Sequence, residues 1–181
     1  MRRAGALALL LFLAGCASAP APPPAAAAHG PPAFALDGRI GVRDGEHSFF
    51  GNLHWRAAAG GDELILATPL GQGVARITRS ADATVLQWPD GRSEMAADPE
   101  DLLKKVLGFR LPLGGLDYWV EGRLDPHRPG EVVRNGEGRI ERLSQDGWQV
   151  HYLAYAGTRP ARLRLRRDDI EVTLIVDRWE R

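Results

Sequence analysis

Histidine, serine and carboxylate side chains are the groups of this sequence that could act as catalysts or metal ligands. The five histidines show no pair at the i,i+4 spacing that places two zinc ligands on one helix face: His29, His47, His54, His127 and His151. His47 and Ser48 are neighbours, but adjacent residues of a strand point to opposite faces, so they do not form a nucleophile–base pair. These positions predict no catalytic or metal site.

Two further patterns have simpler structural explanations. Gly71-Gln72-Gly73 begins like the dinucleotide-binding motif GxGxxG, but Arg76 occupies the last glycine position and no strand–helix unit follows. The acidic pairs Glu100-Asp101 and Asp168-Asp169 suit the start of a helix and a turn. We therefore expect no enzyme and no cofactor.

Cys16 is the only cysteine in the chain, and its position points to lipid chemistry. Arg2 and Arg3 precede an apolar run that ends in Leu13-Ala14-Gly15-Cys16, the layout of a secretory signal peptide with a bacterial lipobox. The run is too short to span a bilayer, which takes about 20 residues. We expect cleavage before Cys16 and acylation of its thiol and amine. The alternative is an ordinary signal peptide with an incidental cysteine.

The composition indicates one domain on a tether. Residues 1–15 are the expected signal peptide, residues 16–33 an acylated cysteine followed by an extended Ala/Pro tether, and residues 34–181 a single domain. The 23 basic and 23 acidic residues balance, so the charge does not suggest nucleic-acid binding. An aspartate after the acylated cysteine generally signals retention at the inner membrane. Ala17 stands there instead and favours the outer membrane.

Alternation of apolar and polar residues predicts half-buried strands over most of the domain. Tight turns such as Pro89-Asp90-Gly91 and Asp146-Gly147 join successive strands, which indicates an antiparallel meander. The predicted strands cover residues 49–55, 64–66, 74–78, 84–88, 93–95, 140–143, 148–152, 162–166 and 170–176.

One helical insertion interrupts these strands. Asp98 is a good N-cap, Pro99 suits the first helical position and Gly108 can end the helix. A shorter helix is predicted over 115–120. The fold class is therefore mainly β with a helical insertion (β+α).

Thr68-Pro69-Leu70-Gly71 places a leucine at the tip of a predicted turn. Pattern alone leaves two interpretations of Leu70. It folds back over its own hairpin, or it is an exposed apolar tip that touches a membrane or lipid.

The apolar interior also has two interpretations. Tryptophans mostly fill cores, but a curved sheet with helices laid inside could instead leave a dry gap that accepts an acyl chain. The residues expected to line such a gap are Trp55, Leu64, Leu66, Leu102, Val106 and Trp148.

Arg162, Arg164 and Arg166 alternate with leucines along one predicted strand. They form either a solvated strand face or a surface for an acidic partner or anionic lipid.

From Phe34 to the C-terminus, the chain resembles the LolB family of outer-membrane lipoprotein receptors. Order and spacing agree across all of the matching segments, which are Gly38–Val42, Gly51–Trp55, Leu66–Gly71, Leu102–Gly108, Leu111–Leu113, Tyr118–Gly122, Gly147–Tyr152 and Asp177–Trp179.

This resemblance implies an open, unclosed antiparallel β-barrel whose helices cover an apolar cavity for the acyl chains of cargo. It implies a monomeric receptor that takes lipoproteins from a LolA-like periplasmic carrier and inserts them into the outer membrane without ATP. In that family a loop residue promotes membrane insertion, and the matching loop here is Pro69-Leu70-Gly71, with Leu70 in that role. Family members commonly have a helix before the first strand, where this chain has its Ala/Pro segment.

Two other functions stay open on the sequence. One is a lipoprotein that binds a different lipid cargo. The other is a structural or assembly lipoprotein of the outer membrane with a solid core, which would not take up fatty-acid analogues.

Overall fold

The computed structural model describes residues 32–180. The predicted signal peptide, the acylation site Cys16 and nearly all of the predicted tether therefore lie outside the described residues. The first strand begins at Pro32, close to the predicted start of the domain at Phe34.

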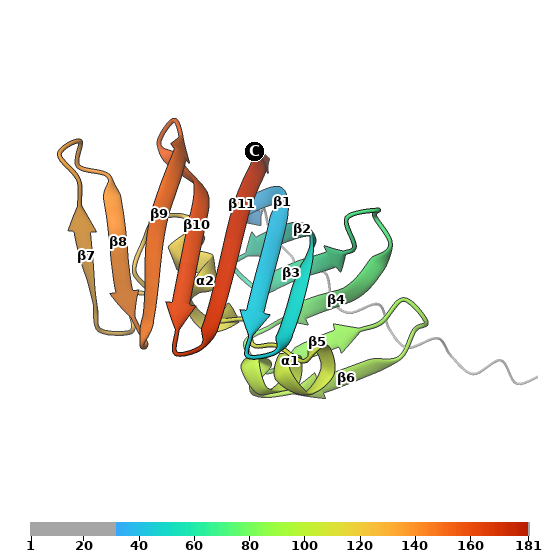
Figure 1. Ribbon diagram of the computed structural model, residues 1–181. Coiled ribbons are helices and arrows are strands. Elements are labelled where there is room, and N and C mark those ends of the chain that lie inside the picture. Colours follow the sequence, from blue (N-terminus) through green and yellow to red (C-terminus); the bar gives the residue numbers. More distant parts are fainter. Residues whose placement is uncertain (1–31, 181) are drawn as a thin grey trace, which may run out of the picture.

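The described chain folds as antiparallel strands with two helices inserted after the sixth strand (Figure 1). Before the helices lie β1 (Pro32–Asp44), β2 (His47–Ala58), β3 (Gly61–Ala67), β4 (Gly73–Arg79), β5 (Thr84–Gln87) and β6 (Ser93–Ala96). The helices are α1 (Pro99–Leu107) and α2 (Leu113–Val120). They are followed by β7 (Gly130–Arg134), β8 (Ile140–Gln145), β9 (Trp148–Ala156), β10 (Arg159–Arg167) and β11 (Ile170–Glu180).

All strands belong to one 11-stranded sheet in the order β6-β5-β4-β3-β2-β1-β11-β10-β9-β8-β7. The first and last strands pair at its centre, with Ile40 opposite Leu174. The two edges are β6 and β7, which are consecutive strands in the sequence. The order is that of a meander around a ring opened at one point, so the expected unclosed antiparallel barrel is confirmed.

The helices connect the two edges of the sheet. In Figure 1, α1 lies beside β5 and β6, and α2 lies behind β10 and β11. Helix α1 begins as predicted, because the Asp98 carboxylate accepts a hydrogen bond from the Asp101 amide at 3.0 Å. It ends at Gly108, whose φ of 81° is readily adopted only without a side chain. Helix α2 begins slightly earlier than predicted, at Leu113.

Alternation along the strands buries one face of the sheet beneath these helices. Leu163 and Leu165 of β10 are fully buried, whereas the arginines between and beside them point to the other side. The buried face and the apolar sides of both helices form one continuous core. We call the opposite, solvent-facing side of the sheet the outer face.

Strand β2 needs a glycine where β3 ends beside it. A Cβ added to Gly51 would lie 2.1 Å from the carbonyl oxygen of Ala67, so no side chain fits there. The chain turns away from β2 directly after Ala67, and this close approach fixes where the β3–β4 turn leaves the sheet.

Candidate lipid-handling site

The turn between β3 and β4 has a well-defined hydrogen-bonded geometry. The Gly71 amide donates to the Thr68 carbonyl at 2.8 Å, and the Thr68 amide donates to the Gln72 carbonyl at 2.8 Å. Gly71 has a φ of 85°, and Leu70 does not have a positive φ. This is a type I turn followed by a left-handed glycine, a common short connection between antiparallel strands.

Side chains brace this turn from two directions. The Gln72 amide donates to the Thr68 hydroxyl at 3.2 Å, and the Asn52 side-chain amide donates to the Thr68 carbonyl at 3.2 Å. The base of the turn is thereby tied to β2 as well as to its own strands. In Figure 1 the hairpin made by β3 and β4 extends to the right of the molecule.

Leu70 at the tip of this turn is 91% exposed. The interpretation in which it folds back over its own hairpin is not what the structure shows. The β5–β6 turn, Trp88–Arg92, has the same pattern of backbone hydrogen bonds and the same Pro-x-Gly core, but carries Asp90 at the equivalent tip. The turn geometry therefore accepts a charged residue, and an apolar one at position 70 is not required for folding.

The six residues predicted to line an apolar gap all face the interior of the fold. Trp55, Leu64, Leu66, Leu102 and Trp148 are buried, and Val106 is partly buried against the same core. Trp55 and Leu64 lie opposite each other on β2 and β3. Trp148 lies on β9 near Trp119 of α2, with their ring centroids 6.4 Å apart. In this conformation the interior around them is occupied by packed side chains of the sheet and helices.

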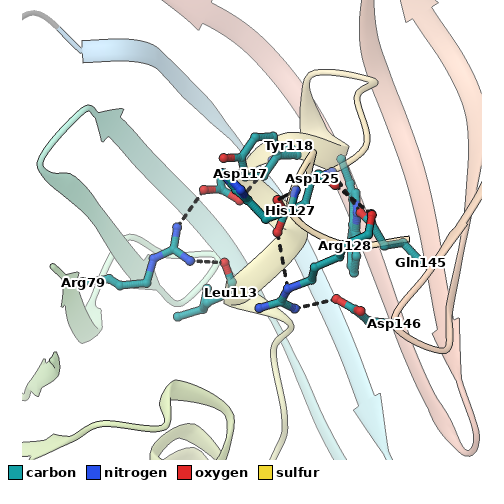
Figure 2. Close-up of polar contacts among 10 residues, drawn as sticks. Arg79, Leu113, Asp117, Tyr118, Asp125, His127, Arg128, Gln145 and Asp146 are labelled. Atoms are coloured by element: carbon teal, nitrogen blue, oxygen red, sulfur yellow. Dashed lines mark hydrogen bonds and ion pairs between the residues drawn. The ribbon is translucent and has the colours of Figure 1, made fainter. Parts of the chain in front are cut away.

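Helix α2 is attached to the β3–β4 side of the sheet by a partly buried charge cluster (Figure 2). Arg79 of β4 pairs with Asp62 of β3 at 2.7 Å and with Asp117 of α2 at 2.9 Å. It also donates to the carbonyl of Leu113 at the start of the helix. Burial raises the pKa of Asp62, against the opposing effects of Arg79 and of the Trp55 indole N–H, which donates to Asp62 at 3.0 Å.

On its other side, α2 is attached to β8 and β9. The Gln145 side-chain oxygen accepts from the Trp119 indole N–H and from the Asp125 amide, both at 2.9 Å. The Tyr152 hydroxyl donates to the Trp119 carbonyl at 2.7 Å, and burial raises the pKa of this phenol well above its usual value. Figure 2 shows Gln145 and Arg79 reaching the helical segment from opposite sides.

A pocket of about 640 Å³ opens beside the Arg79 cluster. It lies between α2 and the turns that follow β2 and β4. Its lining combines Phe34 and the alanines of the β2–β3 turn with the charged groups of Asp62, Arg79 and Asp117.

Arg79, Asp62 and Gln145, which position the helices, were not among the residues predicted from the sequence. A signal existed for Asp62, because it shares the period-two face of Leu64 and Leu66 and a carboxylate at a core position requires a partner. No local pattern indicated that this partner is Arg79 on the next strand.

The described residues include one group that could be considered for a metal: Asp37, His54 and Glu180. These side chains already bond to one another and to arginines, and the His54 Nδ1 contacts the Asp37 carboxylate. Arg178 binds Asp37, the Arg56 side chain donates to His54 Nε2 at 3.2 Å, and Arg56 pairs with Glu180 at 3.5 Å. The arrangement is an ion-pair network on the outer face and is poorly suited to a cation.

Residues 32–179 match the family model described as outer membrane lipoprotein LolB. The chain belongs to the LolB family. It is 40% identical over 184 residues to the outer-membrane lipoprotein LolB of Thiobacillus denitrificans, covering 99% of this chain and 98% of that protein. It is 36% identical over 152 residues to LolB of Pseudomonas aeruginosa, covering 82% of this chain and 74% of that protein.

Among solved structures, a LolA superfamily protein of Nitrosomonas europaea has a similar fold. The TM-score is 0.51 at 8% sequence identity, over 81% of this chain and 84% of that one. At this identity the similarity concerns the fold alone.

Membership of the LolB family establishes what this chain does. It is an outer-membrane lipoprotein that acts as a receptor in lipoprotein localisation, and the family is not one of enzymes. The family resemblance found in the sequence is thus confirmed. Between residues 32 and 180, neither helix has the length and hydropathy needed to cross a bilayer.

Proposed function

We propose that this LolB-family receptor takes lipoproteins from a LolA-like periplasmic carrier and delivers them to the outer membrane through the Leu70 turn. Acylation of Cys16 anchors the receptor, and the interior face holds the acyl chains of the cargo during transfer. The observation that carries the proposal is the 91% exposure of Leu70 on a braced turn whose geometry does not require leucine.

The apolar interior supports the sheltering step. Each acyl methylene removed from water contributes about 0.8 kcal/mol, so a cargo with several chains needs an extensive apolar contact surface. The residues proposed for that surface are Trp55, Leu64, Leu66, Leu102, Val106 and Trp148, which face inward from both halves of the sheet and from α1. Because the helices cover this face, acyl chains enter when α1 and α2 shift away from it.

Transfer without ATP requires that affinity for the acyl chains increase from carrier to receptor to bilayer. A tethered receptor keeps the last step close to its target. An exposed leucine at the end of a rigid turn can enter the interfacial region of a bilayer at little conformational cost, because the turn is already ordered by its own hydrogen bonds.

The test is a two-step transfer assay. A LolA-like carrier loaded with a fluorescent lipoprotein is mixed with a soluble form of the receptor beginning at residue 17, which retains every described strand and helix. Liposomes are then added. We expect label to move from carrier to receptor for both the native sequence and Leu70→Glu, and to reach liposomes only with the native sequence.

The β5–β6 turn supplies the matched control. Asp90→Asn alters the equivalent tip of the second Pro-x-Gly turn and should leave both steps unchanged. If no label leaves the carrier, the proposed transfer of cargo from carrier to receptor is wrong. If Leu70→Glu delivers cargo as well as the native sequence does, the role of the turn is wrong.

A fluorescent fatty-acid analogue separates this proposal from the structural alternative. Saturable uptake that lipoprotein cargo displaces is the expected result. A protein that uses its sheet only as a docking surface, with a solid core, would show no uptake.

A further inference from the structure

A row of side chains on the outer face crosses six strands without a single carboxylate. Strand pairing places Arg142 of β8 beside His151 of β9, and His151 beside Arg164 of β10. The row continues through Thr173 and Gly41 to Phe50 of β2. We call this row, with its neighbours Arg43 and Arg162, the outer arginine band.

The arginines of this band differ from most others in the described chain. Arg43, Arg142, Arg162 and Arg164 have no carboxylate within 4.0 Å among residues 32–180. Two acidic side chains of the outer face are paired with other arginines: Glu171, which lies opposite Arg43 in the β1–β11 register, pairs with Arg166, and Asp177 pairs with Arg39. The full chain has no net formal charge, so the band is a local concentration of positive charge.

Arg164 shows that the positive charge of the band is not explained by ion pairs or hydrogen bonds within the described residues. Its Nε is shielded from solvent and has no hydrogen-bond partner among the described residues. A guanidinium prefers hydrogen bonds to carboxylate or phosphate oxygens, and an unsatisfied donor of this kind is unusual in a native fold. The buried Nε is out of reach of an external anion, which would accept from the other N–H groups of the same guanidinium.

The Phe50 end of the band is hollowed. A groove of about 280 Å³ runs over Gly41, with the Phe50 ring on one side and Arg43, Ser48 and Thr173 around it. Glu171 also lines this groove, and its carboxylate is paired with Arg166. Phe50 is 57% exposed. Guanidinium groups bind phosphate, and an aromatic ring can enter the boundary between lipid headgroups and acyl chains. The two together suit a phospholipid surface.

We infer that the outer arginine band binds the anionic phosphate headgroups of the membrane to which the receptor is attached. A chain tethered to a bilayer meets that surface at an effective concentration on the order of millimolar, far above that of a free acidic partner. The contact orients the folded domain on the membrane. It rests on membrane attachment and is independent of the cargo hand-off proposed above.

The test uses the full acylated protein in vesicles. Cys16 is the only cysteine in the sequence and its thiol is the acylation site, so an environment-sensitive dye can be attached to a single introduced thiol. Thr173→Cys reports on the band. Gly136→Cys, in the β7–β8 turn with open space around it, reports on a distant site. Vesicles contain phosphatidylcholine alone or phosphatidylcholine with phosphatidylglycerol.

We expect the dye at position 173 to shift to an apolar emission only in phosphatidylglycerol vesicles, and the dye at position 136 to stay unchanged. High salt should reverse the shift. Each arginine near an anionic surface is worth about a fivefold change in the docking equilibrium. The triple change Arg142→Gln, Arg162→Gln and Arg164→Gln should therefore weaken docking by about 100-fold.

A charge-matched control removes three arginines elsewhere. Arg92→Gln, Arg123→Gln and Arg139→Gln change the net charge equally, but each of these residues is paired with a nearby carboxylate outside the band. This control should keep the shift. An equal shift in both kinds of vesicle, or one that the band variant retains, overturns the inference. If the band variant still docks on phosphatidylglycerol vesicles but no longer binds an acidic protein, the inference is also overturned.

Discussion

At the scale of single residues, Leu70 and Asp90 make the clearest comparison in the molecule. Both lie at the tip of a turn with a left-handed glycine behind them, Gly71 with φ 85° and Gly91 with φ 87°. Proline precedes each of them. The backbone has the same requirements at the two sites. Asp90 accepts hydrogen bonds from the Arg92 amide and side chain within its own turn, whereas the structure shows no such internal role for the exposed side chain of Leu70.

Leu70→Asp should therefore leave folding intact. We expect the free energy of unfolding in urea to stay within about 0.5 kcal/mol of the native value, because the side chain contacts solvent and the turn already tolerates aspartate elsewhere. A destabilisation of several kcal/mol would show that Leu70 has a structural role.

Arg79 is the residue on which the attachment of α2 to β3 and β4 depends. Its side chain is 20% exposed and pairs with both Asp62 and Asp117. Removing one member of a buried ion pair leaves an uncompensated charge, which typically costs about 3–5 kcal/mol.

Arg79→Gln should destabilise the fold by roughly that amount at neutral pH, as measured by urea unfolding. Without the guanidinium, only the hydrogen bond from the Trp55 indole N–H opposes the effect of burial on Asp62, and the pKa of Asp62 rises further above the unfolded value. A group with a raised folded pKa favours the folded state at low pH, and that contribution is lost as the pH rises through the folded pKa. The deficit should therefore shrink on acidification. A deficit independent of pH would show that lost packing, not Asp62 ionisation, is responsible.

At the scale of elements, α1 could be predicted from the sequence and β7 could not, because only α1 has residues that mark its own start and end. The start and end of α1 are set by Asp98, Pro99 and Gly108 within the segment itself. Strand β7 is exposed at every position, so it has no alternation of apolar and polar residues and exists because β8 pairs with it. Local signals identify elements that carry their own boundaries, and they miss an edge strand defined by its neighbour.

Some features of the candidate site could likewise be predicted from local sequence, and others could not. The turn chemistry of Pro69 and Gly71 is enough to predict Leu70 at a tip, and period-two alternation is enough to predict that Trp55 and Leu64 face inward. The exposure of Leu70 depends on the position of the whole hairpin. The attachments of α2 join residues far apart in the sequence, such as Trp119 and Gln145, which no local pattern connects.

The glycine beside the β3–β4 turn gives an element-scale prediction. Gly51→Ala should destabilise the protein by about 3 kcal/mol or more, because the added Cβ would meet the Ala67 carbonyl oxygen at 2.1 Å. Thermal unfolding is the measurement. Gly136→Ala, with no atom within 4 Å of the new Cβ, is the control and should change little. Equal behaviour of the two variants would contradict the packing argument.

At the scale of the whole molecule, the sheet and the helices are held in different ways. Every strand is bonded to its neighbours by backbone hydrogen bonds, whereas the helices are attached to the sheet by side chains such as Arg79, Gln145 and Tyr152. Segments held by fewer contacts open at lower free energy than the central strands do.

Hydrogen exchange can show whether acyl chains enter beneath the helices. With lipoprotein bound, we expect faster amide exchange in α1 and α2 and unchanged protection in β1 and β11 at the centre of the sheet. Full protection of both helices in a cargo-loaded receptor would place the acyl chains elsewhere.

The gap between β6 and β7 has a mechanical consequence. The circumference of a closed barrel is fixed by its strand number and stagger, so its bore cannot widen without breaking backbone hydrogen bonds. Here no backbone ladder joins β6 to β7. The segment that carries α1 and α2 links the two edges and is held to the sheet by side chains such as Arg79 and Gln145, so the edges can move relative to each other while every ladder stays intact. We therefore expect the width of the interior to be adjustable, so that the cargo proposed above can differ in bulk without the loss of a backbone hydrogen bond between strands.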